Sequence, residues 1–149
     1  MAGHPSFVLK RTYLAMRKRM DEVLQPLGLT AAQFDIFQQL LHEDGLEHRV
    51  MQERLGVTSP TLTNIIDVMV ERGLVERRIS PVDARVKLLF LTPKAHDLHG
   101  ELGVAGEAFV QTMFAGFSRS ETALFMDWLE RVTRNFEAPD LQAPESSTP

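Results

Sequence analysis

The stretch at residues 46–93 constrains the fold of this chain more than any other part of the sequence. Two segments of helical length are joined by a turn at Gly56, and the second segment ends at Gly73. Two runs of branched residues follow, separated by a charged turn that contains Asp83. A helix, a tight turn, a second helix and a basic two-stranded hairpin, in this order, are typical of a protein that binds duplex DNA.

The second of these helices is predicted to start at Thr58 or Ser59 and to bury one face. Its apolar residues recur with the spacing of an amphipathic helix: Leu62, Ile65, Ile66, Met69 and Val70. The other positions near its start carry short side chains, most of them able to hydrogen-bond: Ser59, Pro60, Thr61, Thr63 and Asn64. Such a surface approaches base edges closely in a major groove, where asparagine bonds adenine in bidentate fashion. The structural alternative is that these residues only cap the helix, and the two roles are compatible.

The hairpin is predicted to consist of strands at 74–79 and 86–91 with a turn at 80–84. Four basic residues lie along it: Arg77, Arg78, Arg85 and Lys87. Arg85 lies at the tip, and Asp83 is placed to hold its guanidinium, so both are candidate DNA-binding residues. Because narrow minor grooves attract arginine, we expect Arg85 to enter one. The alternative is a solvated hairpin tip.

Helices are also predicted on the N-terminal side of this stretch. The first covers residues 6–25 and is broken by residues 26–28, which include Pro and Gly. A capping box from Thr30 to Gln33 opens the next helix. Its apolar face carries Phe34, Phe37, Leu40 and Leu41. A short helix over 48–55 is expected to turn inward the side chains of Val50, Met51 and Leu55.

Two further helices are predicted on the C-terminal side. Thr92 as the N-cap and Pro93 at the first position open a long helix that extends to about Phe117. A second capping box, at residues 118–121, opens the last helix. Its Trp128 is expected to pack in a core or a subunit interface rather than in a ligand site.

The terminal helices cannot bury their apolar faces efficiently as isolated pieces. We therefore predict a homodimer in which residues 5–28 and 97–137 form the dimerisation helices. Residues 30–96 form the winged-helix DNA-binding domain, and residues 138–149, rich in Pro, Ser and Thr, form a flexible tail. A two-fold dimer presents two recognition helices to a palindromic site, about one helical turn of DNA apart.

Composition excludes several classes of protein. The absence of cysteine rules out disulfides, thiolate metal ligands and thiol-based redox sensing. The N-terminus has no segment of signal-peptide length, and no apolar run approaches the roughly 20 residues of a membrane span. We therefore expect a soluble, cytoplasmic protein without a membrane partner.

The net charge of −4 conceals an uneven distribution. Residues 47–96 carry eight Lys and Arg against six Asp and Glu, whereas residues 97–149 carry three against nine. Local charge determines the field that a phosphate backbone meets, so the negative total is compatible with DNA binding. The acidic C-terminal part is expected to lie away from the DNA.

With these motifs in place, the chain resembles the MarR family of winged-helix transcriptional regulators. The resemblance extends to about Phe136 and rests on the order and spacing of residues 49–58, 62–67, 71–77, 83–85 and 91–94. It implies a mainly α fold with a small β-hairpin wing, an α+β winged helix-turn-helix with dimerisation helices at both ends. It also implies a dimeric regulator, expected to be a repressor, whose helix from Ser59 and wing-tip Arg85 contact DNA. Ala84 stands where the family often has a further arginine, which implies a weaker contribution from the wing.

The resemblance also implies an effector. Family members often release DNA when a small aromatic or phenolic compound binds between the dimerisation helices and the DNA-binding lobe. The candidate lining residues are Tyr13, Met16, Arg17, Met20, Phe34, Phe37 and His42, most of which are equally compatible with core positions. No cofactor is expected.

Three alternatives remain open from the sequence. A zinc-responsive regulator of the same fold would use histidines such as His42, His48, His96 and His99, of which the last two have helical i, i+3 spacing. An enzyme is not expected, because the chain has no phosphate-binding glycine loop, zincin motif or nucleophile elbow. A winged helix that binds only protein would differ from a DNA-binding one in lacking a steep salt dependence of duplex binding.

Overall fold

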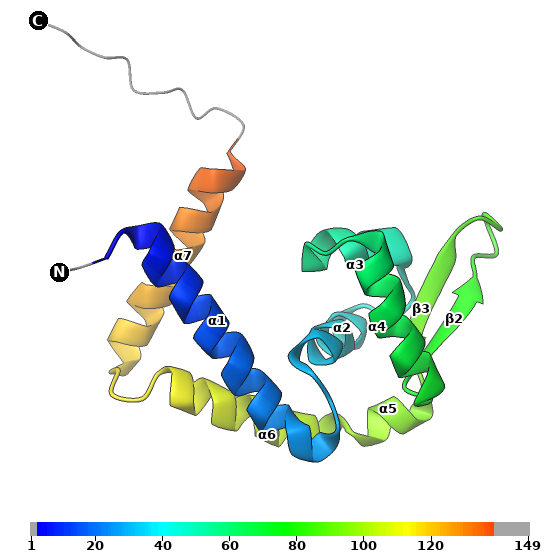
Figure 1. The fold of residues 1–149 in the computed structure, drawn as a ribbon, viewed down its shortest axis with the longest axis horizontal. Coiled ribbons are helices and arrows are strands. Elements are labelled where there is room, and N and C mark those ends of the chain that lie inside the picture. Colours follow the sequence, from blue (N-terminus) through cyan, green and yellow to red (C-terminus); the bar gives the residue numbers. More distant parts are fainter. Residues whose placement is uncertain (1–2, 139–149) are drawn as a thin grey trace, which may run out of the picture. The chain divides into compact units, whose positions relative to one another are not determined.

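The structure, a computed structural model, describes residues 3–138. Helices dominate it, and a small antiparallel sheet forms the wing, as the predicted fold class requires (Figure 1). The chain divides into two compact units, the first ending at Val110 and the second beginning at Gln111. Apart from Ala138, the tail predicted at 138–149 lies outside the described residues.

The first unit contains most of the secondary structure. Its helices and strands, in chain order, are α1 (Pro5–Leu24), the 3₁₀ turn η1 (Gln25–Leu27), α2 (Ala31–His42), β1 (Leu46–Glu47), α3 (His48–Leu55), α4 (Ser59–Glu71), β2 (Val75–Ile79), β3 (Lys87–Leu91) and α5 (Pro93–Asp97). Helix α6 (His99–Met113) begins in this unit and ends in the second. None of the described helices is long and apolar enough to cross a membrane.

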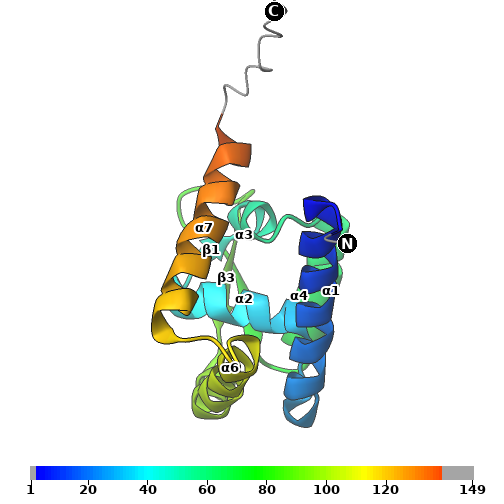
Figure 2. The same cartoon turned by 90° about the vertical axis from the view of Figure 1, so that its left-hand side faces the viewer.

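Helix α2 lies at the centre of the core of this unit. It contacts α1, α3, α4 and β3 (Figures 1 and 2). The predicted capping box is present, with the Thr30 hydroxyl accepting from the Gln33 N–H at 3.2 Å and the Gln33 side chain accepting from the Thr30 N–H at 3.1 Å. Phe34, Phe37 and Leu40 are buried as predicted, whereas Leu41 borders an open pocket and stays partly exposed.

The helix-turn-helix has the boundaries that the sequence indicated. Helix α3 ends at Gly56, whose φ of 62° lies in the left-handed region that glycine adopts without strain. Thr58 then caps α4. The apolar stripe of α4 packs into the core, with Leu62, Ile66 and Met69 fully buried and Ile65 and Val70 partly buried.

The sheet has three strands in the order β1-β3-β2. Strands β2 and β3 form the expected antiparallel hairpin, each starting one residue later than predicted. Strand β1 pairs Leu46 with Leu89 and Glu47 with Leu88. The sequence did not indicate this strand, because two residues are too few to show an alternating pattern.

The single helix predicted from Pro93 to about Phe117 is wrong. The chain forms α5 and α6 instead, with a break at Leu98, whose N–H bonds the Ala95 carbonyl three residues earlier. This tighter bond turns the chain between the two helices. Helix α6 then ends at Met113, well before the predicted end.

The second unit contains the end of α6 and helix α7 (Arg119–Glu137). The second predicted capping box is present, with Ser118 and Glu121 bonding each other's backbone N–H groups. Edge-to-face rings of Phe114, Phe117 and Phe125, with centroids 5.9–6.3 Å apart, pack around the connection between the helices. No residue of α7 is buried in the single chain.

Candidate nucleic-acid interface

The exposed side of α4 carries four of the five helix residues predicted to contact DNA. Ser59, Pro60, Thr61 and Asn64 are exposed in the first two turns of the helix. The buried face of α4 fixes the direction in which these side chains point. The Thr58 hydroxyl accepts from the Thr61 N–H and lies 2.9 Å from the Thr61 hydroxyl, so the cap also positions one candidate contact.

The fifth candidate, Thr63, points elsewhere. It is partly buried, and its hydroxyl lies 3.4 Å from Nε2 of His48 at the start of α3. The contact joins the two helices of the helix-turn-helix. Thr63 therefore lies beside the exposed strip and borders a cavity described below.

The wing tip is ordered by hydrogen bonds within the turn. The Ser80 hydroxyl accepts from the N–H groups of Val82 and Asp83, at 3.2 and 3.4 Å. The Ser80 N–H in turn donates to the carbonyl of Val86 at 2.9 Å, which closes the hairpin. These bonds give the tip a defined conformation and place Asp83 next to Arg85.

Arg85 is held in the way that the sequence suggested. Its Nε and Nη2 donate to the two carboxylate oxygens of Asp83 at 3.1 Å each, and its backbone N–H donates to the same carboxylate at 3.0 Å. These bonds lower the pKa of Asp83, so the carboxylate remains ionised. The Arg85 side chain is nevertheless 91% exposed. The turn therefore presents a guanidinium to solvent in a fixed orientation.

The remaining basic residues of the hairpin lie on opposite faces of the sheet. Arg77 and Lys87 share the face that is turned toward α3 and α4, and Arg77 forms an ion pair with Asp67 of α4. Arg78 lies on the other face, where it pairs with Glu76 at 3.1 Å and stacks over the ring of Phe90 at 4.3 Å. The structure therefore does not bring Arg78 together with the other candidates.

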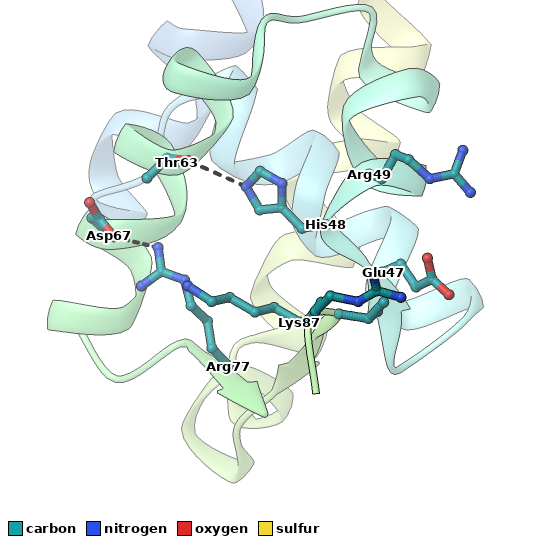
Figure 3. Close-up of a pocket in the computed structure, with 9 residues that line it drawn as sticks. Glu47, His48, Arg49, Thr63, Asp67, Arg77 and Lys87 are labelled. Atoms are coloured by element: carbon teal, nitrogen blue, oxygen red, sulfur yellow. Dashed lines mark hydrogen bonds and ion pairs between the residues drawn. The ribbon is translucent and has the colours of Figure 1, made fainter. Parts of the chain in front are cut away.

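A cavity of about 500 Å³ lies between α3, α4 and the wing, and we call it the basic cavity (Figure 3). Its lining residues are Glu47, His48, Arg49, Thr63, Asp67, Arg77, Arg85, Val86 and Lys87. Partial burial, together with the charges of Arg77 and Lys87, lowers the pKa of His48. From the sequence, His48 is a candidate only for metal binding, because nothing local to α3 indicates that the wing faces it.

The candidate effector residues lie in different surroundings and, within residues 3–138, do not line one common pocket. Phe34 and Phe37 belong to the core and border an open pocket of about 320 Å³ between α2 and α6, which Leu41 and His99 also line. Arg17 pairs with Asp35 at 2.5 Å and borders a separate surface pocket. Met16 and Met20 are partly buried, whereas Tyr13 and His42 are exposed.

The described residues also bear on the zinc alternative. Among residues 3–138, no group of three or more His, Asp or Glu side chains is close enough together to hold a metal ion. His42, His96 and His99 are exposed, and His48 faces Thr63. The structure therefore gives the zinc-responsive alternative no support.

Comparisons with known proteins agree with this architecture. The MarR family model matches residues 27–86. YwoH of Bacillus subtilis strain 168, an uncharacterized HTH-type transcriptional regulator, is 30% identical over 108 residues, which are 72% of this chain and 78% of YwoH. The PcaV transcriptional regulator of Streptomyces coelicolor, solved with its natural ligand, is 28% identical with a TM-score of 0.75, over 89% of this chain and 94% of PcaV.

A mutant E. coli MarR solved with operator DNA shares the fold, with a TM-score of 0.79 at 24% identity over 85% of this chain and 91% of that one. The family match and the identity with YwoH are similarities of sequence as well as of fold. The match with YwoH spans more than two thirds of both chains. The chain therefore belongs to the MarR family of DNA-binding transcriptional regulators, which are not enzymes.

Proposed function

We propose that the protein is a homodimeric repressor that binds a palindromic operator in the cytoplasm and is released from it by a small aromatic or phenolic compound. The main observation in support of operator binding is that two exposed elements occur together. One is the short, polar strip on α4, and the other is Arg85, presented at the wing tip by Asp83.

Each element suits a different groove of the duplex. The strip on α4 has no bulky side chain over its first two turns, so it enters a major groove closely enough for Asn64 to bond an adenine edge. Arg85 is exposed and pre-oriented, which reduces the entropy lost when it enters a minor groove. Lys87, in the basic cavity, adds positive charge for the phosphate backbone.

A second copy of the chain is the proposed cover for the terminal helices. On α1, Phe7 is 73% exposed, and on α7 Trp128 and Phe136 are 59% and 75% exposed. Large exposed apolar side chains clustered on a helix face mark an interaction surface. Trp128, expected in a core or an interface, is not buried by any part of residues 3–138, which supports the interface.

The proposed effector site is the open pocket between α2 and α6. Its lining combines the rings of Phe34 and Phe37 with the imidazole of His99. Aromatic walls with one polar group suit a planar ligand that carries a hydroxyl or carboxylate. The solved complex of PcaV with its natural ligand supports a ligand-responsive role for this chain as well.

The test is selection of bound sequences from a random duplex library with the purified full-length chain. We expect an inverted repeat with half-sites about 10 base pairs apart to be enriched. Phenolic compounds are then added to the complex, and release of the duplex is measured. A folded protein that enriches no sequence and binds no duplex at low salt would refute the DNA-binding role and favour a winged helix that binds protein.

A further inference from the structure

The basic cavity contains a titratable residue, His48, that has no part in the DNA contacts proposed so far. His48, the first residue of α3, projects its imidazole across the cavity toward Thr63 of α4 (Figure 3). Thr63 directly precedes Asn64, the candidate base contact. His48 therefore contacts the recognition helix directly, one position before Asn64.

The charges around His48 come from every element packed against it. Arg77 of β2, Lys87 of β3 and Arg85 of the wing tip contribute positive charge, as does Arg49 of α3 itself, whereas Glu47 of β1 and Asp67 of α4 contribute negative charge. Asp67 is already paired with Arg77, and Arg85 is paired with Asp83 outside the cavity. Arg49 is likewise paired with Glu53, which does not line the cavity. Lys87 forms no ion pair among the described residues, and the lining as a whole holds four basic side chains against two carboxylates, Glu47 and Asp67.

Given the DNA-binding function proposed above, on which this inference rests, we propose that the basic cavity receives a backbone phosphate of the operator and that His48 takes up a proton when it does. The cavity opens between the recognition helix and the wing, the two elements that would lie in adjacent grooves, and a phosphate strand separates those grooves. His48 would then be a phosphate-binding residue whose positive charge exists only in the complex.

The surroundings of His48 explain why the charge is absent before DNA arrives. Its burial and the nearby cations Arg77 and Lys87 lower its pKa, so the free protein holds a neutral imidazole at neutral pH. A phosphate brings the opposite charge next to the ring and favours the imidazolium. The pKa of His48 is therefore higher in the complex than in the free protein.

The sign of the pH dependence follows from this difference. A group that gains a proton on binding makes the affinity rise as the pH falls. The gain is complete below the pKa of the free protein, itself below the ordinary histidine value, and it is lost as the pH rises through the pKa of the complex. Each unit of pKa difference changes the affinity about tenfold for each His48 engaged.

The experiment measures the affinity of the wild-type chain for duplex DNA between about pH 5.5 and pH 8.5, where histidines titrate. The probes are the duplex recovered by selection and a mixed-sequence duplex at low salt, because phosphate contacts do not depend on sequence. The test variant is His48→Gln, whose amide keeps a polar group near Thr63 but cannot titrate. The control is His96→Gln, which removes an exposed histidine outside the cavity.

We expect wild type and His96→Gln to bind the duplex at least about tenfold more tightly near pH 5.5 than near pH 8.5. His48→Gln should lose most of this difference. NMR titration of the His48 ring, with and without duplex, gives the same answer without a variant, since its pKa should rise on binding. DNA binding whose pH dependence is unchanged in His48→Gln, or an unshifted His48 titration, would overturn the inference and leave the proposed function standing. No duplex binding at any pH would overturn both.

Discussion

Helices α4 and α7 are both amphipathic and both begin with a side-chain cap, but they differ in what covers their apolar face. In α4, Leu62, Ile66 and Met69 are fully buried within the same chain. In α7, which is longer, no residue is buried, and Trp128 is among the exposed ones. An amphipathic pattern thus shows that a helix has a face to cover, but not whether the cover belongs to the same chain.

This difference between α4 and α7 corresponds to two tasks in the proposed function, which are to hold the DNA-contacting side chains in place and to pair two chains. The first unit has a core of its own, formed by α2, α4 and the sheet, which holds the proposed DNA-contacting side chains in place. The exposed faces of α1 and α7 contribute little to that core. In the proposed dimer, they instead fix the distance between two DNA-contacting surfaces.

The largest expected effect of a single substitution is on the core of α4. Ile66→Ala should lower the free energy of unfolding by about 2–5 kcal/mol, because it leaves a cavity in a fully packed interior. The matched control is Val82→Ala at the wing tip, where a 94% exposed side chain should change it by less than about 0.5 kcal/mol. Chemical denaturation measures both, and equal effects would show that α4 is not anchored as described.

The next effect is on DNA binding and compares the two sides of the hairpin. Arg85→Ala should weaken operator binding by about 1–3 kcal/mol and leave dimerisation unchanged. Arg78→Ala should cost less, because Arg78 lies on the opposite face with Glu76 and Phe90. Fluorescence anisotropy with labelled operator measures both affinities. A larger loss for Arg78 would mean that DNA approaches the other face of the sheet.

The smallest effect compares the same capping motif in the two units. Thr30→Ala and Ser118→Ala each remove the hydroxyl of a capping box, at a cost of about 1 kcal/mol. For Thr30 the loss should appear in the unfolding of the first unit, because α2 lies in its core. For Ser118 it should appear as a weaker dimer at low protein concentration, measured by sedimentation. A Ser118 variant that loses stability without any change in association would contradict the division of tasks.

Local features of the fold were predictable from the sequence. Both capping boxes, the glycine turn at Gly56 and the buried stripe of α4 are present, because each depends on residues within a few positions of one another. The fold class and the family followed from the order of these features along the chain.

Features that depend on distant residues were not predictable. Strand β1 exists only because β3, more than forty positions later, pairs with it. The break at Leu98 appears in the structure as a tighter backbone hydrogen bond to Ala95, and no Gly or Pro at that position in the sequence marks it. Which of Arg77 and Arg78 faces α3 and α4 depends on how the sheet docks on the helices, and the position of His48 in the basic cavity depends on the same docking.

The number of chains in solution and on DNA tests the central claim most directly. Sedimentation equilibrium of the purified protein, alone and with the selected operator, gives both numbers. We predict twice the 16.8 kDa chain mass in the free protein, and two chains on each operator duplex. A monomer in solution that binds the duplex as one chain would contradict the assignment of the exposed faces of α1 and α7 to a second copy.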